Sequence, residues 1–253
     1  FITVKWRPHL TFSLKRGASL FRFSWKLLVS SLLDTGYKKL RSFVIGLKFD
    51  SEALAAHDQG AMYPELVMNA VNGSIQSVML PVLSEQQDDL PRMKQMMRRS
   101  VMVSSFLVLP MMAGLAAVAQ PLIHLLLTEK WLPCVPFLQI CCIDFAFYPI
   151  HTANLQAINA MGRSDVFLRL ELVKKSYGVA ILLIALFCFD TPLAIAWGAA
   201  LSTLLSALVN ASPNRRLLGY GYLEQMRDIL PSLLCALVMF AAVHAMNALP
   251  LPP

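Results

Sequence analysis

Four long stretches of this sequence lack Asp, Glu, Lys and Arg altogether: residues 66–84, 100–128, 191–214 and 229–253. A helix needs about 20 consecutive, mostly apolar residues to cross the hydrocarbon core of a bilayer. Charge-free runs of that length, repeated and separated by basic clusters, are not expected in the core of a water-soluble domain. The sequence therefore predicts a multi-pass membrane protein.

Charge is also scarce in the composition as a whole. Charged residues make up 15% of the chain, against about 25% in soluble domains. Hydrophobic residues make up 57%, and the mean hydropathy is +0.57. The formal net charge of +7 is what basic residues gathered in cytoplasmic loops produce. No aromatic–basic RNA-binding motif or zinc-finger spacing is present, so we expect no nucleic-acid partner.

Signatures of catalysis are missing as well. The sequence contains no HExxH, GxSxG, P-loop or paired-carboxylate motif. Its five cysteines form no CxxC pair or disulfide framework, and we expect them to be small packing residues. We predict that the chain is not an enzyme and that it has no catalytic residue, metal site or cofactor.

The predicted fold class is all-α, a polytopic transmembrane bundle of about seven membrane helices. The chain begins at Phe1 without a signal peptide, which we interpret as an internal start of a fragment. Residues 1–22 are interpreted as a cytoplasmic basic lead-in, and residues 23–253 as a single transmembrane domain. The seven helices are expected at residues 23–47, 61–83, 101–127, 132–160, 172–189, 192–210 and 229–249.

The segments between these helices are expected to be short. Residues 47–60 form the longest expected loop on the outer side. Residues 84–100 fit a cytoplasmic amphipathic turn and helix, but the preferred interpretation is a solvated loop in which Arg98 and Arg99 anchor at the headgroups. Pro110 and Pro149 fall in the middle of expected helices. They fit either ordinary kinks or the interrupted helices of transporters.

The basic residues predict the orientation. With the N-terminus inside, the outer segments hold only Lys48 and Lys130. The positive-inside rule then places the N-terminus in the cytoplasm. The 17 basic residues assigned to cytoplasmic segments are Lys5, Arg7, Lys15, Arg16, Arg22, Lys26, Arg92, Lys94, Arg98, Arg99, Arg163, Arg169, Lys174, Lys175, Arg215, Arg216 and Arg227.

The first expected helix carries charges within its apolar sequence. Asp34, Lys38 and Arg41 follow an i, i+4, i+7 spacing and share one helix face, with Tyr37 beside them. Charges at bilayer depth are costly and usually face a bundle interior or a watery cavity. We interpret this face as a cationic wall for an anionic group such as a pyrophosphate. The alternative is a helix end whose side chains snorkel to the headgroups.

Polar residues at membrane depth add further candidates. Glu65 and Asn69 recur at helical spacing on the second expected helix, and His151 and Asn154 do so on the fourth. His151 fits a titrating or ligand-touching group, or a hydrogen-bonded histidine between helices. The candidate substrate-binding residues are Asp34, Tyr37, Lys38, Arg41, Glu65, Asn69, His151 and Asn154.

Several segments, taken together, resemble a known family. VMLPVLSEQQDD with the basic helix after it, LTEKWLPCVPFLQI, and PIHTANLQAINAMGRSDVFLRLELVKK resemble the C-terminal half of Wzx-type lipopolysaccharide and capsular polysaccharide flippases. These belong to the MATE-like (multidrug/oligosaccharidyl-lipid/polysaccharide exporter) superfamily. The resemblance covers residues 5–190, and the last helices match only in hydropathy. Other members tend to have aromatic-aromatic-Asn-Arg-Gly where this chain has Ala56, His57, Asp58, Gln59 and Gly60.

The resemblance implies that the chain is one lobe of a two-lobed transporter of ~12–14 helices, whose N-terminal lobe is not in this sequence. It implies a place in the bacterial cytoplasmic (inner) membrane, surrounded by membrane lipids. It also implies that the substrate is an undecaprenyl-pyrophosphate-linked oligosaccharide, moved from the cytoplasmic to the periplasmic leaflet. Lys38 and Arg41 are the positions here that suit the pyrophosphate.

Two other functions remain open. A ligase or polymerase of polysaccharide assembly would place its working residues in a large periplasmic loop, and none is expected here. A multidrug antiporter of the same superfamily would need acidic cavity residues, for which Asp34, Glu65 and Asp144 are available.

Overall fold

The structure, a computed structural model, describes residues 14–248. Every regular element in this range is a helix, which confirms the predicted all-α class. Residues 1–13 of the expected basic lead-in and the last residue of the expected helix 229–249 lie outside the described residues. The elements are α1 Leu14–Lys48, α2 Ser51–Glu85, α3 Leu90–Ala117, α4 Ala119–Leu126, the 3-10 helix η1 Glu129–Cys134, α5 Val135–Ala146, α6 Tyr148–Ala160, α7 Ser164–Cys188, α8 Pro192–Leu217 and α9 Tyr222–Ala248.

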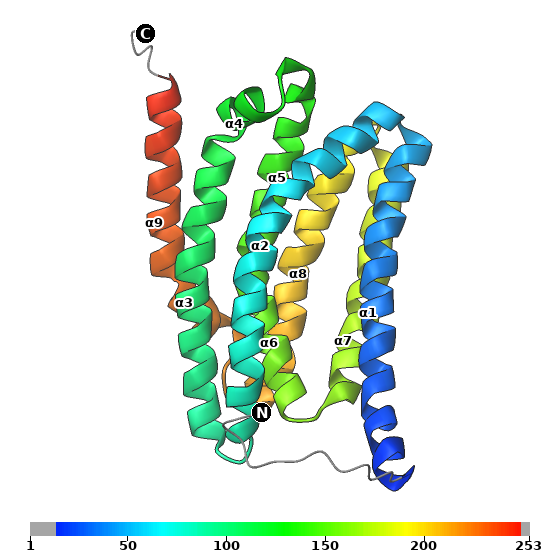
Figure 1. The fold of residues 1–253 in the computed structure, drawn as a ribbon, viewed down its shortest axis with the longest axis vertical. Coiled ribbons are helices and arrows are strands. Elements are labelled where there is room, and N and C mark those ends of the chain that lie inside the picture. The colour runs from blue at the N-terminus through cyan, green and yellow to red at the C-terminus, as the bar shows by residue number, and fades with distance from the viewer. Residues whose placement is uncertain (1–13, 249–253) are drawn as a thin grey trace, which may run out of the picture.

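The helices run side by side along the long axis of the molecule (Figure 1). The most extensive packing joins α3 to α9, α1 to α7, α2 to α5 and α7 to α8. α1 and α9 therefore lie at opposite edges of the bundle (Figure 1). The start of α1 and the turns at 86–89 and 161–163 lie at the lower end, whereas the α1–α2 turn and α4 lie at the upper end.

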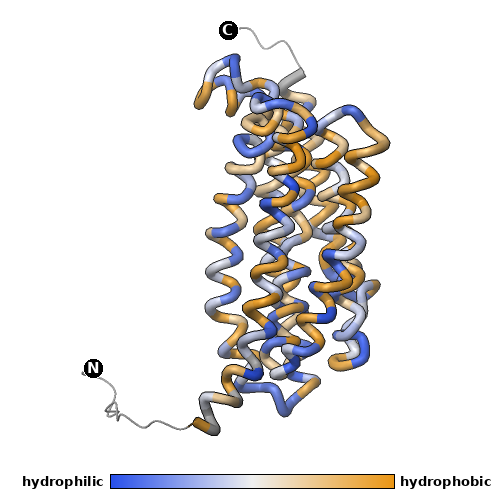
Figure 2. The backbone as a smooth tube through the Cα atoms, turned by 90° about the vertical axis from the view of Figure 1, so that its right-hand side faces the viewer, coloured by the Kyte–Doolittle hydropathy of each residue, from blue (hydrophilic) through white to orange (hydrophobic). Residues whose placement is uncertain are grey.

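Within residues 14–248, five helical segments are long and apolar enough to cross a membrane, so the chain is a polytopic helical membrane protein. Apolar residues cover most of the length of these helices (Figure 2). Among the seven expected helices, α1 and α7 are not in this group. They have 35 and 25 residues, which is sufficient length, but charged side chains interrupt their apolar sequence. The five segments are Ser51–Glu85, Leu90–Ala117, Glu129–Ala160, Pro192–Leu217 and Tyr222–Met246.

The expected outer loop at residues 47–60 is wrong, because α2 begins at Ser51. Only Phe49 and Asp50 separate α1 from α2. Asp50 caps the new helix, since its carboxylate accepts a hydrogen bond of 2.6 Å from the backbone N–H of Ala53. Polar residues in 51–60 thus belong to a helix, which the N-cap position of Asp50 could have indicated.

The preferred solvated loop at residues 84–100 is wrong, because most of this segment is helix. Asp89 accepts a hydrogen bond of 3.0 Å from the backbone N–H of Arg92 and so starts α3 at Leu90. The turn is thereby reduced to residues 86–89, and the basic residues that follow it form the first turns of a membrane helix.

Two expected helices are broken. The expected helix 101–127 ends at Ala117 and is followed by the separate short helix α4, whereas Pro110 remains inside α3. The expected helix 132–160 starts with a 3-10 turn and is interrupted at Phe147, just before Pro149. Since the ring of Pro149 cannot donate a hydrogen bond and clashes with the preceding turn, it restarts the helix as α6.

The expected helix 172–189 begins too late. α7 starts at Ser164, directly after a turn in which Gly162 has a positive φ of 70°. Lys174 and Lys175 therefore lie inside a long helix and not in a connection between helices.

α2 packs closely against η1 and α5 at Gly60. A Cβ atom on Gly60 would lie 2.7 Å from the carbonyl oxygen of Cys134 and 2.9 Å from the backbone nitrogen of Leu138. No other residue type fits this approach. Next to it, the buried ring of His57 packs edge-on against Phe137, with ring centroids 5.7 Å apart.

α9 is fastened to α3 near the lower end of the bundle. The Arg98 guanidinium donates two hydrogen bonds, of 2.6 and 2.7 Å, to the buried carboxylate of Asp228. Lys94 pairs with Glu224 at 3.0 Å. Burial raises the pKa of Tyr220, and its hydrogen bond to Asp228 raises it further, so that the hydroxyl stays protonated.

Candidate functional site

A cavity of about 200 Å³ lies between α1, α5, α6, α7 and α8. Its walls combine aromatic rings with an unusual number of charged groups for a helical membrane protein. The charged side chains that line it are four cations and three carboxylates: Lys38, Arg41, Lys174, Lys175, Asp34, Asp144 and Glu171.

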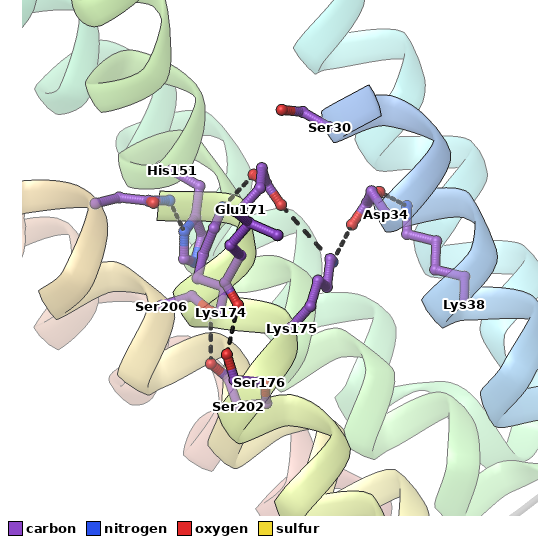
Figure 3. Close-up of polar contacts among 12 residues, drawn as sticks. Ser30, Asp34, Lys38, His151, Glu171, Lys174, Lys175, Ser176, Ser202 and Ser206 are labelled. Atoms are coloured by element: carbon purple, nitrogen blue, oxygen red, sulfur yellow. Dashed lines mark hydrogen bonds and ion pairs between the residues drawn. The ribbon is translucent and has the colours of Figure 1, made fainter. Parts of the chain in front are cut away.

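An ion-pair chain connects α1 to α7 across this cavity (Figure 3). The Asp34 carboxylate lies 3.2 Å from the Lys38 ammonium on its own helix and 2.6 Å from the Lys175 ammonium on α7. Lys175 in turn lies 3.9 Å from the Glu171 carboxylate. One carboxylate is thus shared by two lysines that come from different helices.

The α7 side of the chain is more buried than the α1 side. Glu171 pairs with Lys174, and these side chains are only 7% and 11% exposed. The Lys38 and Asp34 side chains are 48% and 42% exposed. The charged chain thus runs from a buried pair on α7 to an accessible cation on α1.

Hydroxyl groups continue the polar lining behind these charges. The Tyr37 hydroxyl donates a hydrogen bond of 3.0 Å to the carbonyl oxygen of Gly178, and this contact also ties α1 to α7. Ser206 on α8 donates to the carbonyl of Ser202 at 2.8 Å and lies 2.6 Å from the Tyr177 hydroxyl. Ser202 and Ser206 lie below the charged groups in the close-up (Figure 3).

Asp34 and Lys175, which form the ion pair between α1 and α7, lie far from the upper ends of their helices. At 1.5 Å per residue, Asp34 is about 20 Å from the Lys48 end of α1, and Lys175 is about 20 Å from the Cys188 end of α7. A bilayer core is about 30 Å thick. Side chains at such depth on both helices are positioned to meet each other rather than to reach the headgroups.

Arg41 differs from the three lysines of the cavity. Within residues 14–248 it forms no hydrogen bond and no ion pair, and its Nε atom is buried without a partner. Leaving a buried charged donor unsatisfied is costly, so the group is suited to an anion that is not part of this chain.

The cavity also holds one carboxylate without a partner. The Oδ1 atom of Asp144 is buried and makes no hydrogen bond with any described residue. His151, which also lines the cavity, is buried, and its Nδ1 atom accepts a hydrogen bond of 3.0 Å from the Asn210 amide. Within the described range, no three His, Cys, Asp or Glu side chains are grouped as metal ligands.

Five of the eight residues predicted from the sequence meet in this cavity: Asp34, Tyr37, Lys38, Arg41 and His151. Glu65 and Asn69 do not line it and are exposed on α2. Any role of the eight residues in binding remains a prediction.

Asn154 does not line the cavity and instead belongs to a buried amide network. Its Nδ2 donates to Gln225 Oε1 at 2.8 Å, while Gln225 Nε2 donates back to Asn154 Oδ1 at 3.0 Å. Asn214 donates to the same oxygen at 2.7 Å. All three residues are fully buried, so the network links α6, α8 and α9.

Glu171, Lys174 and Lys175 were missed as site residues because the start of α7 was expected too late. The signal was present in the sequence: Gly162 followed by Ser164 and Asp165 is typical of a turn followed by a helix start. With α7 starting there, the three charges fall about two to three turns inside a membrane-length helix, a position at which charged residues are candidates for a functional site.

Comparison with known proteins identifies the family. Residues 1–136 match the family described as "Polysaccharide biosynthesis protein", which is more than half of the 253 residues. The chain belongs to this family. This agrees with the resemblance to polysaccharide exporters noted in the sequence.

Two bacterial relatives are similar along most of this chain. The succinoglycan biosynthesis transport protein ExoT of Rhizobium meliloti is 26% identical over 239 residues, which is 90% of this chain and 44% of the relative. The lipopolysaccharide biosynthesis protein WzxC of Escherichia coli is 23% identical over 208 residues, or 81% of this chain and 41% of the relative.

A Klebsiella pneumoniae membrane protein from a cps region is 30% identical over 149 residues, which cover 59% of this chain and 29% of that protein. The chain thus spans less than half the length of these relatives. No solved structure matches it.

Proposed function

We propose that this chain is one lobe of a membrane exporter that moves a lipid-linked oligosaccharide across the bacterial cytoplasmic membrane for lipopolysaccharide or capsular polysaccharide synthesis. Membership in the polysaccharide biosynthesis family supports this, as does the similarity to a protein named as a transport protein. An N-terminal lobe completes the transporter, since this chain covers at most 44% of the relatives reported above.

In the proposed topology, α1 and α7 cross the membrane together with the five apolar segments, and residues 1–22 lie on the cytoplasmic side. Charged side chains within these two helices are tolerable at membrane depth because the ion pair between Asp34 on α1 and Lys175 on α7 neutralises both charges. The basic residues near the lower end of the bundle, among them Arg92, Arg99 and Arg163, favour the cytoplasm for that end.

Arg41 is the proposed anion ligand, and its lack of a partner is the observation that carries the proposal. A guanidinium binds phosphate oxygens as a bidentate fork, which suits the diphosphate that joins a carrier lipid to its sugar. Lys38 lies one turn away on the same helix and is 48% exposed, so it reaches the same group.

Because the Asp34 carboxylate pairs with both Lys38 and Lys175, Lys38 has a partner within the chain when no substrate is bound and can exchange it for the substrate anion. While no substrate is bound, Asp34 neutralises Lys38 and Lys175 and keeps two cations at membrane depth acceptable. A diphosphate that binds Lys38 and Arg41 competes with Asp34 for Lys38. Asp34 then remains paired with Lys175, and this exchange lets the site release its anion again.

The chain does no covalent chemistry in this account. The ligase or polymerase alternative loses support, because the turn between α1 and α2 contains only two residues. A multidrug antiporter remains the second candidate. It is favoured by the buried, unpartnered Oδ1 of Asp144, which would suit a cationic ligand.

The proposal is tested by polysaccharide export in cells that carry the full-length protein. We expect Lys38→Ala with Arg41→Ala to abolish surface polysaccharide while the protein still inserts in the membrane, because the anion loses both ligands. Asp144→Asn should retain export. Normal export by the double variant would contradict the anion-binding role of Lys38 and Arg41 and reopen the antiporter function.

A matched control is available at the lower end of the bundle. Arg92 is exposed, has no ion pair among the described residues and lies outside the cavity. Arg92→Ala removes one cation without touching the site, and export should continue at the wild-type level.

A further inference from the structure

A second and larger cavity opens near the lower end of the bundle, away from the charged cavity. It has a volume of about 1090 Å³ and lies between the start of α7, the end of α8 and the start of α9. We call it the lower groove. Its polar wall includes three arginines, Arg163, Arg215 and Arg216, and one carboxylate, Glu224.

The carboxylates near the lower groove are already neutralised. Glu224 pairs with Lys94 at 3.0 Å, and Arg163 pairs with Asp165 at 3.4 Å. Within residues 14–248, Arg215 and Arg216 have neither an ion pair nor a hydrogen bond from their guanidinium groups. The groove therefore keeps two uncompensated positive charges in the last turn of α8.

The alkyl stem of Arg215 lies beside Gly221. A Cβ atom on Gly221 would lie 3.5 Å from Cγ and 3.6 Å from Cδ of Arg215, which is ordinary van der Waals distance. Arg215 and Arg216 are both exposed, so their guanidinium groups are open to an anion in the groove.

An apolar track on α8 leads into the groove. Leu201, Leu204, Leu205 and Leu208 recur at helical spacing and are 37–50% exposed. About two turns after Leu208, on the same helix, come Arg215 and Arg216. A surface that is apolar along the helix and cationic at its end matches one class of ligand, an acyl chain joined to a phosphate.

We propose that the lower groove is a specific site for an anionic glycerophospholipid. The headgroup phosphate binds Arg215 and Arg216, and an acyl chain lies along the leucines of α8. Basic pockets between membrane helices are suited to such headgroups. This assignment does not depend on the proposed export function, because it concerns other residues and a lipid that is not transported.

The test is lipid binding to the purified full-length protein in detergent, measured by native mass spectrometry with two probes. Dioleoylphosphatidylglycerol has a net negative headgroup, and dioleoylphosphatidylcholine has the same acyl chains and the same phosphate with a choline cation beside it. We expect the wild-type protein to bind phosphatidylglycerol about tenfold more tightly, since the choline ammonium offsets the phosphate charge and is repelled by the unpaired arginines.

A charge-matched pair of variants separates a site from general attraction. Arg215→Gln with Arg216→Gln keeps the stems and removes two charges. Arg92→Gln with Arg99→Gln removes two charges from exposed, unpaired positions on α3 at the same end. We expect the first variant to bind phosphatidylglycerol and phosphatidylcholine equally, and the second to keep the tenfold preference.

Three results would overturn the proposal. If both variants lose the preference alike, the effect is surface charge rather than a site. If the α8 variant keeps the preference, the groove is not involved. If sn-glycerol 3-phosphate, which has no acyl chains, displaces phosphatidylglycerol at similar concentrations, the groove is a small-anion site.

A Leu205→Ala/Leu208→Ala variant should bind both lipids more weakly, which tests the apolar track without altering any charge.

Discussion

At the residue scale, Arg41 is set apart by what it lacks. The three lysines of the charged cavity each have a carboxylate within 4.0 Å, whereas Arg41 has none among the described residues. The i, i+4, i+7 spacing predicted from the sequence correctly grouped Asp34, Lys38 and Arg41 on one face. It could not indicate which of the cations would be left unpaired, since Lys175 reaches Asp34 from a helix 141 residues away.

The form of the Arg41 side chain should matter as well as its charge. We expect Arg41→Lys to restore polysaccharide export only partly, because an ammonium keeps the charge but loses the bidentate fork. The measurement is surface polysaccharide per cell at equal protein level, compared with Arg41→Ala. Full export with lysine would show that charge alone suffices and would exclude the fork.

Asp34 should stabilise the fold. We expect Asp34→Asn to lower the free energy of unfolding by about 1–2 kcal/mol, because the Lys175 side chain, which is 17% exposed, loses its nearest carboxylate. The Asp34 side chain is 42% exposed, and solvent screening of its charge keeps the loss moderate. The measurement is thermal unfolding in detergent.

A control for Asp34 exists at the upper end of the bundle. Asp190 pairs with Lys48 at 3.2 Å, but its side chain is 99% exposed. Asp190→Asn should leave the unfolding midpoint unchanged. Equal losses in the two variants would mean that the link between α1 and α7 adds nothing beyond a surface ion pair.

At the scale of the element, helix type and approximate position could be predicted from hydropathy, but helix ends could not. Hydropathy detects the apolar middle of α7 and misses its first two turns, which are polar and carry Glu171. The same error placed residues 51–60 in a loop, although Asp50 caps a helix there. These polar turns are stabilised as helix by packing against other helices, and a local stretch of sequence does not show which helices those are.

The close approach of α2 to α5 gives a prediction within one helix. Gly60→Ala should destabilise the protein by about 1–3 kcal/mol, because the new Cβ would meet backbone atoms of Cys134 and Leu138 that cannot move independently. Thermal unfolding in detergent is the measurement.

Gly73 supplies the control in the same helix. A Cβ there would meet nothing within 4 Å, so Gly73→Ala should stabilise α2 by about 0.5–1 kcal/mol. If both alanine variants change stability in the same direction, the close approach at Gly60 is not what positions α2.

At the scale of the whole molecule, the orientation in the membrane can be tested directly. Ser84 and Thr128 are exposed and lie at the two ends of the bundle. After the exposed Cys188 and Cys235 have been replaced by serine, single cysteines at these two positions should react from opposite sides with a membrane-impermeant maleimide, Ser84→Cys from the cytoplasm. Labelling of both from one side would contradict the proposed topology.

The charged cavity is the central claim at this scale, because it distinguishes a lobe that handles an anionic lipid from an ordinary helical bundle. The most direct measurement is binding of farnesyl diphosphate, a short polyprenyl diphosphate, to the purified full-length protein in detergent. We expect Arg41→Ala to weaken binding about ten- to hundredfold, which corresponds to the roughly 1.5–3 kcal/mol of a hydrogen bond to a charged group, while Arg92→Ala binds like the wild type. Unchanged affinity in a protein that lacks both Lys38 and Arg41 would contradict the account.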